Sequence, residues 1–252
     1  MINLSDKHIC VIGGSRGIGA GSAKLAGSLG ARVSITYGSN KNAAEAVVSE
    51  IRKSGPQAAA FKADMQNEGE IDTAVDAAVK ALGPIHGMVV SAGIFENTTI
   101  DKMTLEFWNR VIGINLTGTM LSVRAAARVM RANKTPGSVV IYTSTAGQSG
   151  GAGASAYCTS KAGQIIFMKS MAYELAAAKI RVNCIAPAWT ETDMADASLE
   201  RLGRDKVAKS FPLGRIGKVT DIANATAFLL SDAAEFITGS TVTVDGGLAM
   251  RG

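Results

Sequence analysis

The 252-residue sequence contains few of the residues on which metal-binding and disulfide-rich proteins depend. There are 2 histidines, His8 and His86, and 3 cysteines, Cys10, Cys158 and Cys184. The cysteines are odd in number, widely spaced and without a C-x-x-C pair, so neither a disulfide framework nor a zinc site is predicted. Two histidines also leave little for Ser-His-Asp chemistry. We therefore expect no metal site and a reducing, cytoplasmic location.

Long apolar runs and linkers are missing as well. No segment approaches the roughly 20 apolar residues that a membrane-spanning helix needs. The apolar run behind Asp6, Lys7 and His8 is too short and too charged for a signal peptide. With 5 prolines and no charge block, linker or repeat, the sequence predicts one domain over residues 1–252 without a membrane contact.

Positive charge is in modest excess and is spread along the chain. The net charge of +5 comes from 26 basic and 21 acidic residues, and only 5% of residues are aromatic. A nucleic-acid-binding protein usually concentrates basic residues on one face beside stacking aromatics, so we expect no nucleic-acid partner. The densest basic set predicts either a solvated or subunit-facing helix end, or a docking site for an acidic partner. This set comprises Arg124, Arg128, Arg131 and Lys134, with Lys179 and Arg181 as further candidates.

Short β-branched runs alternate with helical patterns along the whole chain. Strands are predicted at residues 8–12, 32–37, 58–62, 87–90, 138–143, 180–186 and 241–244. Helices are predicted at residues 17–29, 40–54, 68–82, 105–131, 155–175 and 219–230. This order is typical of βαβ units, so the predicted fold is α/β, a doubly wound three-layer sandwich with a seven-stranded parallel sheet. Gly30, Gly55 and Gly83 follow three of the helices, where a residue of positive φ is expected.

Ligands of such a sheet bind beyond the carboxyl ends of the strands, which directs attention to the loops there. One connection, residues 188–217, is unusually long and has no predicted strand. It contains apolar residues among glycines and charges. We interpret it as a lid over the substrate, with a plain surface excursion containing one short helix as the alternative.

The stretch VIGGSRGIG, residues 11–19, fits two interpretations. Gly13-x-Ser15-x-Gly17 matches the nucleophile elbow of a serine hydrolase, but that elbow needs a later histidine at a strand end, and His86 precedes its strand. A strand, a glycine turn and a helix N-terminus instead favour a phosphate-binding turn. Its predicted contacts are Gly13, Ser15, Arg16, Gly17, Ile18 and Gly19.

The end of the second strand indicates which dinucleotide would bind. An acidic residue there would bind a free ribose 2′-hydroxyl, but the stretch TYGSNK, residues 36–41, has none. Arg16, Ser39 and Asn40, with Lys41, are suited to a 2′-phosphate instead. We therefore expect NADP(H) in preference to NAD(H).

A second group of polar residues predicts acid–base chemistry. Tyr157 and Lys161 are four residues apart at the start of a predicted helix and so share a face. An ammonium close to a phenol favours the phenolate, which makes the pair a tunable acid and base. Ser144 ends a strand at the ligand-facing edge, thirteen residues earlier, and a glycine-rich loop lets the two converge. Asn115 lies inside a predicted helix, where an amide is a mediocre helix former.

These motifs, in this order, resemble the short-chain dehydrogenase/reductase family, and the resemblance covers residues 7–247. The glycine motif is similar to residues 13–19, and the active-site set to Asn115, Ser144, Tyr157 and Lys161. The adenine-contacting acid is similar to Asp64, followed by Met65. NCIAPAWTETDM, residues 183–194, is similar to the segment beside the nicotinamide, and ITGSTVTVDGG to the closing strand. Further cofactor contacts implied by the resemblance are Ser91, Ala92, Gly93, Pro187, Thr190 and Thr192.

The resemblance implies a single Rossmann-like domain, assembled as a homodimer or homotetramer, that transfers hydride between a nicotinamide and a ketone or secondary alcohol. Tyr157 would exchange the proton with the substrate oxygen, and Ser144 would hydrogen-bond that oxygen. Lys161 would lower the pKa of Tyr157 and hold the nicotinamide ribose. Asn115 would position a water that connects Lys161 to solvent.

Two departures from the family pattern stand out. Val90 and Ser91 occupy positions where the family usually has two asparagines, so hydrogen bonds near the adenine ribose must differ. Ala188 replaces the glycine that usually follows Pro187, which restricts the turn near the nicotinamide. Cys158, next to Tyr157, is interpreted as a small buried residue because no histidine accompanies it.

The substrate remains open between two classes. A free small ketone or alcohol is favoured, and a 3-oxoacyl thioester on a carrier protein or on CoA is the alternative. An acidic carrier would dock on the basic set, which predicts turnover that falls steeply with added salt. A cofactor-binding sensor without catalysis is a more remote alternative, against which the complete active-site set argues.

Overall fold

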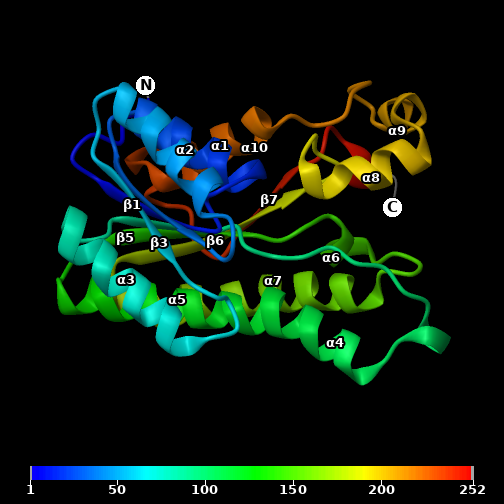
Figure 1. The fold of residues 1–252 in the computed structure, drawn as a ribbon, viewed down its shortest axis with the longest axis horizontal. Coiled ribbons are helices and arrows are strands. Elements are labelled where there is room, and N and C mark those ends of the chain that lie inside the picture. The colour runs from blue at the N-terminus through cyan, green and yellow to red at the C-terminus, as the bar shows by residue number, and fades with distance from the viewer. Residues whose placement is uncertain (1, 251–252) are drawn as a thin grey trace.

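The computed structural model describes residues 2–250 and has a doubly wound α/β fold (Figure 1). Seven parallel strands form one sheet in the order β3-β2-β1-β4-β5-β6-β7. The strands are β1 His8–Ile12, β2 Arg32–Tyr37, β3 Ala58–Lys62, β4 Gly87–Val90, β5 Gly137–Tyr142, β6 Ile180–Pro187 and β7 Thr241–Val244. The predicted strands are confirmed to within one residue at each end.

Helices cover both faces of the sheet, as predicted. Figure 1 shows α1, α2 and α10 on one face and α3, α5 and α7 on the other. Their bounds are α1 Gly17–Ser28, α2 Lys41–Lys53, α3 Glu68–Leu82, α5 Gly118–Ala132, α7 Ser155–Leu175 and α10 Val219–Leu230. Gly30, Gly55 and Gly83 have φ values of 93°, 107° and 81°, which confirms the expected positive φ after three of the helices.

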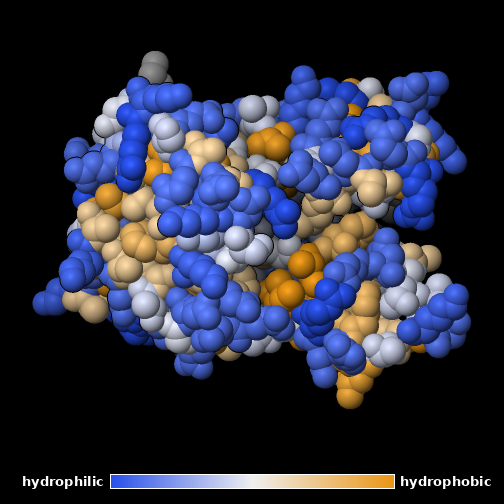
Figure 2. All heavy atoms as spheres, in the orientation of Figure 1, coloured by the Kyte–Doolittle hydropathy of each residue, from blue (hydrophilic) through white to orange (hydrophobic). Residues whose placement is uncertain are grey.

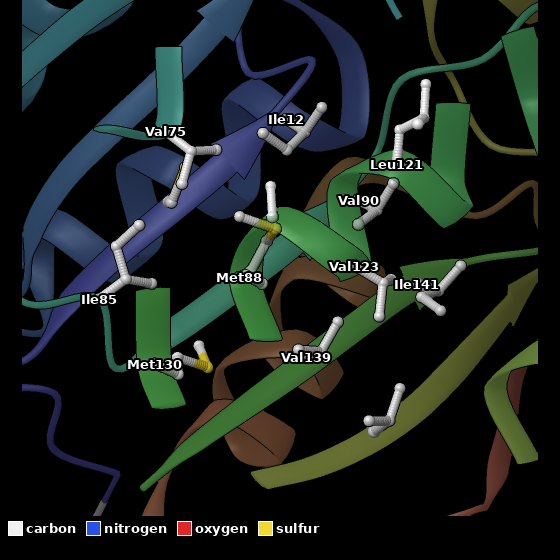
Figure 3. Packing of buried hydrophobic residues seen from close by; sticks show 14 of the residues in the cluster. Ile12, Val75, Ile85, Met88, Val90, Leu121, Val123, Met130, Val139 and Ile141 are labelled. Atoms are coloured by element: carbon white, nitrogen blue, oxygen red, sulfur yellow. The ribbon is translucent and has the colours of Figure 1, made fainter. Parts of the chain in front are cut away.

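The central strands β1, β4, β5 and β6 are buried on both faces, and their side chains divide between two cores. In β1, Cys10 and Ile12 belong to the core beneath α3, α5 and α7, whereas Ile9 and Val11 belong to the core beneath α1, α2 and α10. Figure 3 shows the first of these cores, with residues of β4, β5, α3 and α5 in one cluster. This double burial holds the strand ends, and therefore the loops beyond them, in place.

The predicted helix over residues 105–131 is interrupted. It consists of α4 Leu105–Ile112, a π-helical turn Gly113–Thr117, and α5. A Cβ on Gly118 would lie 2.7 Å from the main-chain oxygen of Met65, so this point of the helix passes directly against the loop after β3. The contact is a tertiary one, which is why periodicity alone predicted a continuous helix.

Residues 188–217 contain two helices, α8 Asp193–Leu202 and α9 Arg204–Ser210, rather than one. They enclose a small core of their own, formed by Ala195, Leu199, Val207, Phe211 and Ile216. The two ends of the segment are joined, because Glu191 N donates to Gly217 O at 2.9 Å and Gly217 N donates to Trp189 O at 3.0 Å. The segment is thus a folded unit with two helices where the alternative interpretation had one, and its role as a lid stays a prediction.

The basic set on α5 is not a free positive patch. Arg124 forms ion pairs with Glu68 and Asp72 of α3, and Arg128 with Asp72 and Asp76 of the same helix. Arg131 donates to the main-chain oxygen of Glu174, and Arg181 to main-chain oxygens that include Leu229 O at 2.6 Å. Acidic and main-chain partners hold four cations of the set, as expected of a solvated helix end, and the alternative of a docking site for an acidic partner stays a prediction.

Both histidines lie at the amino-terminal edge of the sheet, opposite the strand ends that carry Tyr37 and Ser144. His8 Nδ1 lies 2.8 Å from Gly83 O, its Nε2 lies 2.8 Å from Ser34 Oγ, and His86 Nδ1 accepts from His8 N at 3.1 Å. Burial lowers the pKa of His8 to about 4.

The three cysteines are free and buried. Within residues 2–250 no helix has the length and apolar composition of a membrane span, and no group of three potential ligands is placed to hold a metal ion.

Candidate active site

A cleft of about 1060 Å³ lies along the carboxyl ends of the strands. Residues from the loops after β1, β2, β3, β4, β5 and β6 line it, which confirms the edge of the sheet that the sequence indicated. Figure 2 shows the hollow between the part that carries α8 and α9 and the part that carries α4 and α6, with apolar residues visible inside. α6 spans Ala146–Ser149.

The glycine turn after β1 is built so that backbone passes against backbone. Gly13 has a φ of 80°, and a Cβ there would lie 2.7 Å from the main chain of Ala92. A Cβ on Gly19 would lie 2.3 Å from Gly13 O, which no side chain tolerates. Gly17, at a φ of 56°, faces Thr192 instead, and a Cβ there would make an ordinary contact with the Thr192 side chain at 3.7 Å. The first and last glycines are therefore required by packing, and the middle one by its conformation.

The N-terminus of α1 opens into this cleft. The helix begins at Gly17, and Arg16, at the N-cap, makes no side-chain capping bond. The first N–H groups of a helix have no partner within it, and the helix dipole adds positive potential there. Such an end is suited to a phosphate group. Five of the six predicted contacts in this turn line the cleft, namely Gly13, Ser15, Arg16, Gly17 and Ile18, whereas Gly19 is buried and does not.

The loop after β2 only partly matches the prediction. Ser39 lines the cleft, together with Thr36, Tyr37 and Gly38. Asn40 does not, because its Oδ1 accepts from Ala43 N at 2.9 Å and caps α2. An asparagine directly before a helix commonly caps it, and the assignment of Asn40 to a ligand overlooked this local role.

Asp64 and Met65 both line the cleft after β3. Asp64 Oδ1 accepts from Gln66 N at 2.9 Å, and Asp64 N donates to Glu70 Oε2 at 2.9 Å, so the loop is held by its own side chains. Met65 is buried. Gln66 and Glu70, which also line the cleft, were missed by sequence reasoning, although the acid at the first turn of α3 was a visible signal.

The loops after β4 and β6 supply the other predicted cofactor contacts. Ser91, Ala92 and Gly93 line the cleft, and so do Pro187, Thr190 and Thr192. Ser91 Oγ takes up the space where a Cβ on Gly19 would stand, at 2.8 Å, so the departure from the family pattern at this position packs against the glycine turn. Thr190 is buried, and its hydroxyl donates to Ala188 O at 3.0 Å.

Tyr157 and Lys161 lie side by side on the first turns of α7. Lys161 Nζ is 5.7 Å from the centre of the Tyr157 ring and donates to Tyr142 O at 2.8 Å. Ser144 Oγ accepts from Ala146 N at 3.2 Å, a bond that does not use its hydroxyl hydrogen. All three residues line the cleft, so the structure brings together residues that are up to 17 positions apart in the sequence.

Burial sets the protonation states of this group. Burial raises the pKa of Tyr157 to about 12, and the Ser144 side chain acts in the opposite direction. Burial lowers the pKa of Lys161 to about 8. The phenol thus carries its proton at neutral pH, and the causes of its raised pKa do not include the lowering by Lys161 that the sequence suggested.

Asn115 is part of the π-helical turn and is fully buried. Its Oδ1 accepts from Ile94 N at 2.8 Å, and its Nδ2 donates to Ile94 O and to Ser160 Oγ. Its main-chain oxygen accepts from Gln164 Nε2 at 2.8 Å and from Thr119 Oγ1 at 2.6 Å. Asn115 therefore joins α7 to the loop after β4. Asn115 does not line the cleft. Its main-chain oxygen is already occupied by two protein donors, which contrasts with the predicted role of Asn115 in positioning a water.

Sequence reasoning also missed the aromatic residues of the cleft. Phe95 lies edge-on to Tyr157, with ring centroids 4.8 Å apart and an interplanar angle of 75°. Trp189 lies edge-on to Phe95 at 6.0 Å and 85°. Only 5% of the residues are aromatic, so an aromatic residue in a loop at this edge of the sheet is uncommon. Phe95 in the loop after a buried strand and Trp189 directly after Pro187 and Ala188 were therefore visible signals.

Comparisons with known proteins agree with this geometry. The sequence model of the family described as Enoyl-(Acyl carrier protein) reductase matches residues 12–249. The structure of a short-chain type dehydrogenase/reductase from Mycobacterium ulcerans superimposes with a TM-score of 0.93 and 36% identity, over 98% of this chain and 91% of that chain. The chain belongs to the short-chain dehydrogenase/reductase family. Its Rossmann-like fold and the family predicted from the motifs are confirmed.

Other members of the short-chain dehydrogenase/reductase family match along nearly the whole length. The 3-oxoacyl-[acyl-carrier-protein] reductase of Synechocystis sp. is 37% identical over 251 residues, which are 99% of this chain and 100% of that relative. The 3-oxoacyl-[acyl-carrier-protein] reductase FabG of Staphylococcus aureus is 36% identical, over 97% of this chain and 98% of the relative. A dehydrogenase/reductase from Sinorhizobium meliloti superimposes with a TM-score of 0.90 and 34% identity, over 98% of this chain and 96% of that chain. The chain is accordingly an oxidoreductase of this family.

Proposed function

We propose that the protein is an NADP(H)-dependent reductase that transfers hydride from the nicotinamide to a ketone, with Tyr157 as the proton donor. The observation that carries this proposal is the placement of Tyr157, Ser144 and Lys161 in the same cleft as the glycine turn of α1. One cleft thereby holds a site suited to a pyrophosphate and an acid that keeps its proton at neutral pH.

The residues present fit a dinucleotide. The glycine turn offers backbone N–H groups without a bulky side chain, and Gly93 keeps the space in front of Lys161 Nζ open, since a Cβ there would lie 3.7 Å from that nitrogen. Arg16 and Ser39, which line the cleft, would bind a 2′-phosphate, and Asp64 would contact the adenine, as the resemblance implies. When bound, the nicotinamide supplies the hydride.

The protein's own groups handle the proton and the developing charge. The Ser144 hydroxyl, whose oxygen already accepts from Ala146 N, donates to the carbonyl oxygen of the substrate. Tyr157 gives its proton to the same oxygen as the hydride arrives at the carbon, and takes that proton back in the oxidation direction. The charged form of Lys161 stabilises the phenolate that is left.

Two substrate classes have support. The names of the two reductase relatives point to a 3-oxoacyl thioester on a carrier protein, which we propose as the first substrate to test. The pairing of Arg124 and Arg128 with α3 favours a free ketone, because an acidic carrier would find no free cation at these two positions. We also propose a homodimer or homotetramer, as the family resemblance implies.

The test is oxidation of NADPH and of NADH with three substrates: a 3-oxoacyl carrier thioester, its CoA counterpart and a free ketone. We expect turnover with NADPH to exceed that with NADH. Comparison of the thioesters with the free ketone assigns the substrate class. Absence of turnover with every carbonyl, while NADPH still binds, would contradict a catalytic function and favour a cofactor-binding sensor.

A further inference from the structure

The cleft extends beyond Tyr157 toward the lid segment, residues 188–217, and two aromatic side chains form its wall there. We call Phe95 and Trp189 the aromatic wall. They come from different parts of the chain, Phe95 from the loop after β4 and Trp189 from the start of the lid segment, yet their rings are 6.0 Å apart and nearly perpendicular. Phe95 also contacts the ring of Tyr157 edge-on at 4.8 Å. The aromatic wall therefore packs against the ring that carries the proposed proton donor.

The other residues at this end leave room for a broad group. The loop after α6 contributes Gly150, Gly151, Ala152 and Ala154, none of which extends beyond a Cβ. A Cβ on Gly150 would meet no atom within 4 Å. Met194 and Leu248 add flexible apolar surface to the same cleft. The aromatic wall thus bounds one part of this space, and the small side chains of the loop after α6 bound another.

Charged side chains line the cleft at both ends. Arg16, Lys62, Asp64 and Glu70 lie on or next to the loops after β1 and β3, and Asp193 and Arg201 lie on the lid segment, whereas the aromatic wall and residues 150–152 carry no charge. Tyr157 itself is neutral at pH 7, since its pKa is about 12. Aromatic pairs favour edge-to-face contacts, which add to the gain from burying apolar area. A flat ring placed here gains from both effects, whereas a flexible alkyl chain gains only from burial.

We propose that the aromatic wall determines substrate specificity, selecting ketones whose carbonyl carries an aryl or similarly flat apolar group. This inference rests on the proposed carbonyl reduction and deepens it, because it names the substituent next to the reacting carbon. Phe95 acts at the carbonyl side of the group, through its position against Tyr157, and Trp189 closes the wall from the lid segment.

The kinetic test compares an aryl methyl ketone with an aliphatic methyl ketone of equal carbon number. We expect the native protein to prefer the aryl ketone in kcat/KM. Phe95→Leu and Trp189→Leu keep an apolar side chain but remove the ring, so each should lower kcat/KM for the aryl ketone about threefold to tenfold. The value for the aliphatic ketone should stay within about twofold. Phe236→Leu is the matched control, because Phe236 is fully exposed.

An aryl-to-aliphatic ratio that is the same in Phe95→Leu, Trp189→Leu and the native protein would overturn the proposal. A preference for the aliphatic ketone or for a linear 3-oxoacyl thioester in the native protein would also overturn it. The NADPH dissociation constant of each variant is measured in parallel, and both ketones are compared at saturating NADPH, because Trp189 lies between the predicted cofactor contacts Pro187 and Thr190.

A binding measurement keeps the inference separate from the proposed reaction. The chain has 2 tryptophans, Trp108 on α4 and Trp189. Trp108→Phe therefore leaves Trp189 as the only tryptophan reporter, and an aryl ketone should quench its fluorescence saturably. The quenching should weaken when Phe95→Leu is added. If no carbonyl is reduced, the proposed function fails, and the titration still decides the inference: saturable, Phe95-dependent quenching supports it, and absence of such quenching overturns it.

Discussion

The two ends of the cleft are built by different means. At the proposed cofactor end, the shape comes from backbone, since Gly13 and Gly19 pack against main-chain atoms at distances where a Cβ has no space. At the substrate end, the shape comes from side chains, with Phe95, Tyr157 and Trp189 meeting from three separate segments. The first end is therefore nearly a property of one short stretch, whereas the second depends on how distant loops are brought together.

The junction of the two ends is Tyr157, where substitution should have the largest effect. Tyr157→Phe removes the proton donor but keeps the ring, so kcat should fall about 10²- to 10⁴-fold while the NADPH dissociation constant stays within about twofold. Stopped-flow turnover and fluorescence titration measure the two quantities. Tyr173→Phe, at an exposed site on the same helix, is the control and should leave both unchanged. Undiminished turnover in Tyr157→Phe would remove the mechanism.

The cofactor end is tested by Gly19→Ala. A Cβ 2.3 Å from Gly13 O forces the turn apart, and overpacking of this kind costs about 1–3 kcal/mol, up to about a hundredfold in NADPH affinity. Calorimetric titration with NADPH measures the loss. Gly69→Ala is the matched control, because its Cβ would meet only Asn67 Oδ1 at an ordinary 3.5 Å. Equal affinities in the two variants would contradict the account of a turn made by backbone packing.

Cofactor choice should depend on the charge at the same end. Arg16→Ala removes a guanidinium that lines the cleft beside the glycine turn, so the KM for NADPH should rise roughly tenfold while the KM for NADH changes little. The ratio of the two KM values is the measurement. Lys24→Ala, on the same helix but paired with Glu50, serves as the control. If both KM values rose together, Arg16 would act on the turn rather than on a 2′-phosphate.

The pH dependence of kcat tests whether the charge of Lys161 is needed at the junction. Lys161 has its pKa lowered by burial to about 8, so it is charged below that pH and loses its charge as the pH rises through it. Because the charged form stabilises the phenolate, kcat for reduction should fall about fivefold between pH 8 and pH 9. Tyr157, with a pKa of about 12, keeps its proton throughout this range. A kcat that stays flat up to pH 10 would show that the charge of Lys161 is not needed.

The smallest effect is expected away from both ends. Arg128→Ala removes exposed ion pairs with Asp72 and Asp76, which are worth about 0.2–1 kcal/mol of the free energy of unfolding. Turnover of a free ketone should be unchanged, and chemical denaturation measures the stability. If instead the KM for a carrier-bound substrate rose strongly and with a steep salt dependence, this face would take part in docking despite its ion pairs.

Much of the molecule was predictable from local pattern. Strand positions followed from β-branched runs, because strands buried on both faces must be apolar throughout. The glycine turn, Ser144, Tyr157 and Lys161 were predictable because each stands at a strand end or on the first helix turn beyond one. The π-helical turn at Gly113–Thr117 was not predictable, since it lies where Gly118 passes against the loop after β3, a tertiary contact. The cap formed by Asn40 was not predicted either, because the same amide also suits a ligand.

The sequence by itself determined the order of the elements, the parallel sheet and the glycine turn, because apolar periodicity and glycine conformation act over a few neighbouring residues. Only the tertiary structure decided which side chains share the substrate end. Phe95 and Trp189 are 94 positions apart, and their contact depends on the packing of β4 and β6 on either side of β5. It likewise decided that Arg124 and Arg128 are paired, because the acids that hold them lie on a helix some 50 residues earlier.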